Sequence, residues 1–168
     1  GHVRSPARQS SQRRLMKYLE DIVVGSIENF GHYQVSEVEI ISFAMRYDNQ
    51  PFHTDAEAAR DSIYGGLIAS GWHVCAMFMR MACDAGVDEC QPHGMGAPGF
   101  DDLKWLQPVR PGDVLSARTE VLSADPSRLK PYLGVVRSKI QISKQSGAAV
   151  MEMTAIDWVL RRPVPTTD

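Results

Sequence analysis

The chain has 168 residues and a mass of 18.7 kDa, which suits one domain of ordinary size or two very small ones. Hydrophobic residues make up 43% and charged residues 23%, close to the averages of globular domains, so a collagen-like or wholly disordered chain is excluded. The net charge of −2 and the lack of an apolar run of about 18 residues argue against nucleic-acid and membrane partners.

The first 17 residues carry five basic side chains and no acidic one. This composition predicts a flexible basic tail over residues 1–17 and a single domain over residues 18–168. No apolar segment resembles the core of a secretory signal. We therefore expect a cytoplasmic location.

Three cysteines are present, Cys75, Cys83 and Cys90. An odd number argues against a disulfide framework and favours a reducing compartment. Cys90 and His93 could join a neighbouring cysteine or histidine around a metal, but no CxxC or HxxxH pair supports this. No metal is expected.

The first half of the chain predicts short elements. Residues 18–33 indicate a strand or hairpin edge. Ser36 and Glu39 form a capping box, so a helix begins at Ser36 and ends before Pro51. Asp55 caps a second short helix.

Residues 70–84 are apolar on almost every side and too few to span a bilayer, which predicts a helix buried by other structure. Alternating apolar residues then predict strands over 113–124, 135–143 and 148–161. Helices first and strands later indicate an α+β fold, an antiparallel sheet wrapped around a long central helix.

Residues 94–99 match the GxGxxG pattern of dinucleotide-binding folds. Pro98 falls where the helix of that motif would begin, and no βαβ pattern follows. We interpret this stretch as a loop.

Chemistry is concentrated in residues 48–53, DNQPFH. Pro51 prevents helix continuation, so the chain turns and lets Asp48 and His53 point into one cleft. A carboxylate and an imidazole on a short rigid loop suit a general acid–base pair. The alternative is a helix-ending turn with both side chains in solvent.

Three blocks resemble one family, the MaoC-like (R)-specific enoyl-CoA hydratases, which have the hotdog fold. Residues 48–53 resemble the hydratase motif, usually Asp-x-Asn-Pro-x-His. Residues 67–72, LIASGW, are similar to the start of the family's central helix, and residues 103–113, LKWLQPVRPGD, resemble its strand, turn and return strand. Tyr47, Gln50 and Ser70 depart from the usual Gly, Asn and His.

The resemblance implies hydration of a 2-enoyl-CoA to an (R)-3-hydroxyacyl-CoA. His53 would take a proton from water and Asp48 would serve the proton delivered to C2, although the sequence leaves open which does which. The Gly71 N–H would bind the thioester oxygen, because a helix N-terminus presents free donors. Substrate-binding positions would be Gln50, Phe52, Ser70 and Trp72.

The resemblance further implies a substrate carried as a CoA thioester, no other cofactor, and a homodimer or dimer-based oligomer. Candidate contacts for the anionic CoA are Arg110, Arg118, Arg128, Lys130, Arg137 and Lys139. Candidates for the acyl pocket are Phe43, Phe52, Trp72 and Met77, each equally suited to core packing.

Two other functions stay open. A hotdog acyl-CoA thioesterase would release free thiol, but its typical carboxylate on the central helix is missing, because Asp48 precedes that helix. A non-catalytic acyl-CoA-binding domain would be stabilised by CoA without turnover.

Overall fold

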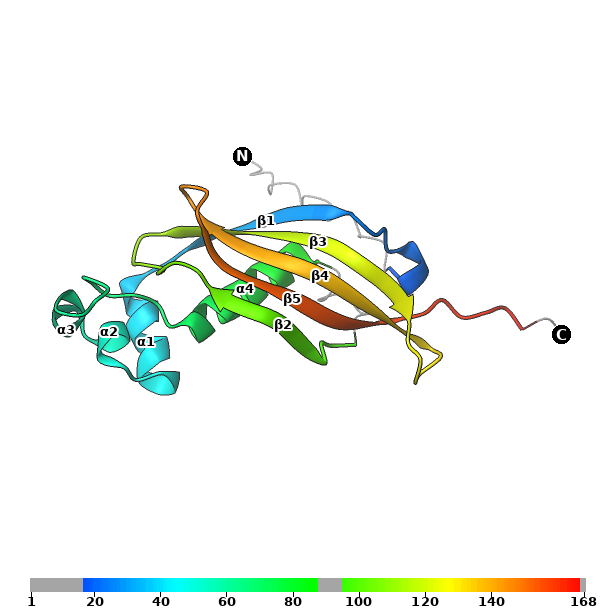
Figure 1. Ribbon diagram of the computed structural model, residues 1–168, viewed down its shortest axis with the longest axis horizontal. Helices are drawn as coiled ribbons and strands as arrows, with labels where there is room; N and C mark the ends of the chain where they lie inside the picture. The colour runs from blue at the N-terminus through cyan, green and yellow to red at the C-terminus, as the bar shows by residue number, and fades with distance from the viewer. Residues whose placement is uncertain (1–16, 88–94, 167–168) are drawn as a thin grey trace, which may run out of the picture.

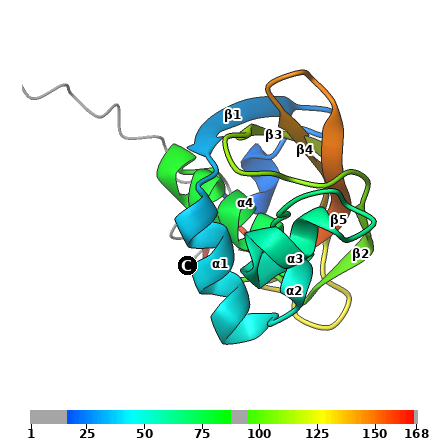
Figure 2. The same cartoon turned by 90° about the vertical axis from the view of Figure 1, so that its left-hand side faces the viewer.

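The computed structural model of the protein describes residues 17–87 and 95–166. Within these residues five strands form one antiparallel sheet in the order β1-β3-β4-β5-β2. The strands are β1 (Ile27–Gln34), β2 (Gly99–Trp105), β3 (Val114–Pro126), β4 (Leu133–Lys144) and β5 (Ala149–Leu160). The sheet curves around one long helix, α4 (Gly71–Ala85), as Figures 1 and 2 show. The predicted α+β architecture is confirmed.

Helix α4 packs one face against the concave side of the sheet. Val74, Met77 and Phe78 are buried on this face and join the inner side chains of Ile140 and Met151 in the main core. These side chains recur at helical spacing on α4 and at alternate positions on the strands, which is the pattern that brings two apolar faces together.

The opposite face of α4 is exposed, and the expectation that the helix is buried on all sides is wrong for a single chain. Trp72, Ala76, Met79 and Cys83 lie three or four positions apart and share this exposed face. The five strands cover only one side of the helix, because β1 and β2 are the two edges of the sheet.

Short helices gather at one end of the sheet, beside the start of α4 (Figure 2). They are α1 (Glu37–Tyr47), α2 (Pro51–Thr54) and α3 (Ala56–Arg60). Ser36 caps α1 by accepting from the Glu39 N–H at 3.2 Å, and Asp55 caps α3, as predicted. The Glu39 carboxylate accepts from the Tyr33 hydroxyl and not from the Ser36 N–H, so only the Ser36 half of the predicted capping box forms. Helix α2 was not predicted and has Pro51 in its first turn, where proline is tolerated.

Three further segments, residues 18–33, 94–99 and 103–113, can be compared with their predictions. Residues 18–33 contain a 3-10 turn, Leu19–Asp21, and most of β1, which is an edge strand. The strand and return strand expected in residues 103–113 are the end of β2 and the approach to β3, which are not neighbours in the sheet. The GxGxxG interpretation is excluded by the antiparallel sheet, although Gly94 itself lies outside the described residues.

The predicted basic tail falls almost wholly in residues 1–16, and Cys90 and His93 in residues 88–94, all outside the described residues. Across residues 17–87 and 95–166, no helix is long and apolar enough to cross a membrane. The same ranges hold no group of three His, Cys, Asp or Glu side chains placed to bind a metal ion.

Candidate active site

The turn between α1 and α2 brings Asp48 and His53 together. Asp48 ends α1 with an extended φ of −152°, and Pro51 starts α2 three residues later, so the chain reverses within one short loop. His53 Nε2 lies 3.4 Å from Asp48 Oδ2, and the two side chains are 6% and 18% exposed. The predicted convergence of a carboxylate and an imidazole is therefore present in the structure.

The hydrogen bond made by the other ring nitrogen of His53 identifies the tautomer of the imidazole. Nδ1 lies 2.7 Å from the carbonyl oxygen of Ile68, which can only accept a hydrogen bond. Nδ1 must therefore carry the proton, and in the neutral ring Nε2 holds a lone pair. This lone pair lies on the Asp48 side of the ring, where it can accept a hydrogen bond from a donor such as water.

Two donors hold the Asp48 carboxylate. The Ser70 hydroxyl donates to Oδ2 at 2.7 Å, and the Gln50 side-chain amide donates to Oδ1 at 2.6 Å. These hydrogen bonds, with a smaller contribution from the nearby His53, hold the pKa of Asp48 below its ordinary value. Asp48 is thus a carboxylate at neutral pH.

Ser70 links this pair to the start of α4. It is fully buried at the N-cap of the helix, yet its hydroxyl is committed to Asp48, and no side chain that the structure describes caps the first turn. The N–H of Gly71 follows directly. An uncapped helix start presents backbone donors and a favourable dipole to a negatively charged oxygen.

A cavity of about 470 Å³ opens beside the pair. Apolar residues form most of its lining, and Gln50, His53, Tyr64 and Gln107 contribute the polar side chains. Its lining residues are Gln50, Phe52, His53, Tyr64, Ile68, Ala69, Gly71, Val74, Trp105, Leu106, Gln107, Pro108, Val109 and Val150. This composition is typical of a small-molecule site.

The predicted site residues fall into two groups. Gln50, Phe52, His53 and Gly71 line the cavity. Asp48 and Ser70 lie behind that wall and are joined to it through His53, Gln50 and the start of α4.

Of the four candidates for the acyl pocket, Phe43, Phe52, Trp72 and Met77, only Phe52 lines the cavity. Phe52 meets the His53 ring edge-on at 4.5 Å. Trp72 is 59% exposed on the outer face of α4, and Phe43 stacks on His73. Met77 is buried in the main core.

Sequence reasoning missed most of the cavity wall. Tyr64, Trp105 and Val150 come from three separate segments of the chain and meet only in the folded protein. The sequence did contain a pointer to Trp105, because it lies in residues 103–113, the third block that resembles the hydratase family.

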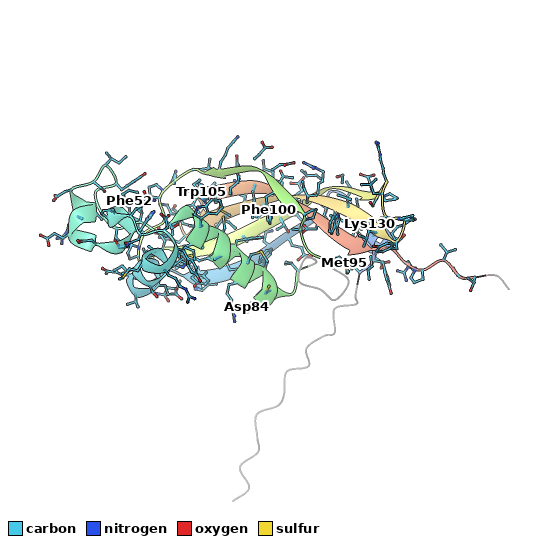
Figure 3. The ribbon with its side chains drawn as sticks, turned by 90° about the horizontal axis from the view of Figure 1, so that it is seen from below. Phe52, Asp84, Met95, Phe100, Trp105 and Lys130 are labelled. Atoms are coloured by element: carbon cyan, nitrogen blue, oxygen red, sulfur yellow. The ribbon has the colours of Figure 1, made fainter. Side chains whose placement is uncertain are left out.

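None of the six cationic candidates is among the described lining residues of this cavity. Arg110 is joined to the cavity wall, since its guanidinium donates to the carbonyl oxygen of Tyr64, a lining residue. Arg118 pairs with Glu120, and Arg137 with Asp101. Lys130 lies over the Trp158 ring. Figure 3 shows Lys130 at the opposite end of the sheet from Phe52.

An antiparallel sheet wrapped around one helix, with a cavity at the helix start, is the hotdog fold. The (R)-hydratase PhaJ1 of Pseudomonas aeruginosa has the same fold, with a TM-score of 0.69 at 23% identity over 90% of this chain and 95% of that one.

A family model described as "MaoC like domain" matches residues 25–141, and the chain therefore belongs to the MaoC-like family. The MaoC-like dehydratase of Rhodospirillum rubrum is 39% identical, with a TM-score of 0.79 over 88% of this chain and 99% of its own. The protein YdeM of Bacillus subtilis (strain 168) is 26% identical over 136 residues, 80% of this chain and 92% of its own.

Proposed function

We propose that this protein reversibly adds water across the C2=C3 bond of a 2-enoyl-CoA to give an (R)-3-hydroxyacyl-CoA. The observation that supports this most directly is the Asp48–His53 pair beside an apolar cavity that also reaches the start of α4. Membership of a dehydratase family agrees with it. A CoA thioester would bring its acyl group into the cavity, and no other cofactor is required.

A single water held between Asp48 Oδ2 and His53 Nε2 would be the nucleophile. Both atoms are hydrogen-bond acceptors when Asp48 is ionised and His53 is neutral, so each can take one hydrogen of that water. As the water oxygen bonds to C3, His53 takes one proton and becomes imidazolium. Asp48 keeps the water oriented and stabilises the imidazolium by its charge.

The C2=C3 electron pair moves toward the thioester carbonyl, whose oxygen becomes negative. The N–H groups at the start of α4, that of Gly71 first among them, would bind this oxygen. Losing one such donor costs an enzyme on the order of 100-fold or more in rate.

Protonation at C2 completes the addition. Because the lowered pKa of Asp48 leaves it ionised at neutral pH, the proton it could donate is absent. The imidazolium formed on His53 is the better donor, and returning its proton to C2 restores the starting enzyme. This reverses the assignment that the resemblance alone suggested for C2.

The two alternatives receive less support. A thioesterase of this fold would need a carboxylate on α4 at the cavity, whereas the acid on α4 is Asp84, near the far end of the helix and paired with Arg80. A non-catalytic binding domain gives no reason for the hydrogen bonds that hold Asp48 ionised beside His53.

We also propose that the protein acts as a homodimer through an apolar α4–β2 surface, formed by Trp72, Ala76, Met79 and Cys83 of α4 with Phe100 and Trp105 of β2. Trp72 and Trp105 join its two parts, with ring centroids 5.1 Å apart. Figure 3 shows α4 and β2 from this side, with Phe100 and Trp105 labelled. An exposed apolar helix face next to an unpaired sheet edge favours a second copy as its cover.

The test is the loss of enoyl-thioester ultraviolet absorbance when the protein is mixed with 2-butenoyl-CoA or longer and branched enoyl-CoAs. Wild-type protein should turn these over, and Asp48→Asn or His53→Ala should lower kcat/KM by about 100-fold or more. Matched controls are Asp61→Asn and His32→Ala, two exposed residues away from the cavity.

Release of free thiol in place of loss of the double bond would favour the thioesterase. Thermal stabilisation by CoA esters without any turnover would favour the binding domain. Either result would overturn the proposed hydration. The cytoplasmic location stays a prediction.

A further inference from the structure

The indole of Trp105 lies directly against the start of α4. Its Nε1–H donates to the carbonyl oxygen of Gly71 at 3.0 Å, which ties β2 to the helix. A β-carbon added to Gly71 would lie 2.6 Å from Cδ2 and 2.7 Å from Nε1 of this indole. Real β-carbons essentially never come so close, so Trp105 requires glycine at position 71.

Gly71 joins two peptide units that matter for the proposed hydration. One unit carries the N–H of Gly71, and the next carries the Gly71 carbonyl and the N–H of Trp72. Glycine allows wide rotation at its α-carbon, and no side-chain cap holds the N–H groups of this first turn. The indole restricts both units, because it occupies the place of a β-carbon at position 71 and its N–H bonds to the Gly71 carbonyl.

We propose that Trp105 is a positioning residue, which holds the Gly71 and Trp72 N–H groups in the orientation that binds the thioester oxygen. The inference rests on the proposed hydration. Trp105 also lines the cavity, so one side chain contacts both the acyl site and the oxyanion donors. A phenylalanine at position 105 would fill similar space but has no N–H for the Gly71 carbonyl.

The kinetic test compares Trp105→Phe with wild type on 2-butenoyl-CoA. Misplaced donors weaken transition-state binding more than substrate binding, so we expect kcat to fall about tenfold while KM changes less than about twofold. Trp158→Phe is the matched control, because Trp158 packs with Lys130 away from the cavity and should keep wild-type kcat. Since Trp105 also lies in the α4–β2 surface, the oligomeric state of each variant is measured alongside.

A second measurement does not depend on turnover. Hydrogen exchange of the Val74 and Cys75 amides reports on the first turn, since Val74 N–H bonds to the Ser70 carbonyl. Trp105→Phe should speed their exchange by about fivefold relative to Trp158→Phe, because loss of the indole bond lets this turn open. An inactive wild-type protein would overturn the hydration, while the exchange data would still decide whether Trp105 holds the helix start.

A pair of variants tests the close approach itself. Gly71→Ala should lower the melting temperature strongly, and Trp105→Leu in the same chain should restore part of that loss, because removing the indole makes room for the β-carbon. The proposal is overturned if Trp105→Phe keeps both the kcat and the amide exchange of wild type. It is also overturned if kcat falls only in step with a loss of folded protein or of the dimer.

Discussion

The Ser70 hydroxyl lies 2.7 Å from Asp48 Oδ2 and donates to it across 22 positions of sequence. This bond joins the end of α1 to the start of α4, and it is the largest cause of the lowered pKa of Asp48. Because Ser70 is fully buried, water cannot readily replace the donor when the hydroxyl is removed.

Ser70→Ala should therefore raise the pKa of Asp48. A carboxyl NMR titration should place the pKa of Asp48 higher in the variant than in wild type, and kcat/KM at neutral pH should fall about tenfold as the carboxylate loses its orientation. Ser62→Ala, which removes a hydroxyl bonded to the Ala59 carbonyl, is the control. An unchanged Asp48 titration in Ser70→Ala would contradict the role given to Ser70.

The same variant makes a prediction about stability. A carboxyl with a lowered folded pKa adds stability above its unfolded pKa of about 3.8 and loses it as pH falls through the folded value. Ser70→Ala should cost about 2 kcal/mol of unfolding free energy at neutral pH. The difference from wild type should shrink below pH 3.8, as denaturant unfolding at several pH values would show.

The buried side chain of His73 should make stability depend on pH in a higher range than Asp48 does. His73 is 6% exposed, stacks on Phe43 with centroids 4.5 Å apart, and its Nδ1 has no hydrogen-bond partner among the described residues. Burial lowers its pKa from 6.5, against a smaller opposing effect of Glu39. The folded protein should therefore lose stability as pH falls below 6.5, where the unfolded chain binds the proton first.

His73→Phe should keep the stacking and remove this dependence. The unfolding free energy of the variant should fall less steeply than that of wild type as pH drops below 6.5, in denaturant titrations. His32→Gln, at an exposed histidine, should leave the wild-type slope unchanged. Parallel curves for wild type and His73→Phe would show that His73 is not the group responsible.

The cavity wall gives a prediction about substrate length. Leu106 lines the cavity but is 45% exposed, so Leu106→Ala should fold normally. If the acyl chain lies along this wall, kcat/KM for 2-hexenoyl-CoA should fall about fivefold more than for 2-butenoyl-CoA, since the longer chain loses more apolar contact. Leu129→Ala, at a leucine 91% exposed, serves as control. Equal losses on both substrates would place the acyl chain elsewhere.

The proposed dimer is tested on its helix. Met79 is 42% exposed in the middle of the α4–β2 surface, and Met79→Glu would place a charge there. Light scattering should give roughly twice 18.7 kDa for wild type and a mass near 18.7 kDa for the variant. Met45→Glu, on α1 and outside the surface, should stay dimeric. A monomeric wild type would exclude the dimer.

Local signals in the sequence predicted the local structure well. The caps at Ser36 and Asp55 and the turn enforced by Pro51 each depend on residues within a few positions, so a pattern of side chains suffices to identify them. The convergence of Asp48 and His53 follows from that same turn.

The rest depends on contacts between distant segments. Tyr64, Trp105 and Val150 meet around the cavity only because the sheet curls around α4, and no periodicity reports such a meeting. The apolar sequence of α4 predicted a helix buried on all sides, whereas the sheet buries only one face, because an apolar pattern does not report which neighbouring segments cover it. Ser70 read as a residue that binds substrate, whereas its hydroxyl is used within the protein.

The uncapped start of α4 has one more consequence. Helices usually gain about 1 kcal/mol from a serine at the N-cap, and here that serine serves Asp48, so the first turn lacks this contribution until an anionic oxygen occupies it. In the proposed hydration, the thioester oxygen would accept hydrogen bonds from these N–H groups. Binding of substrate should therefore stabilise the first turn of α4 and raise the unfolding free energy of the protein.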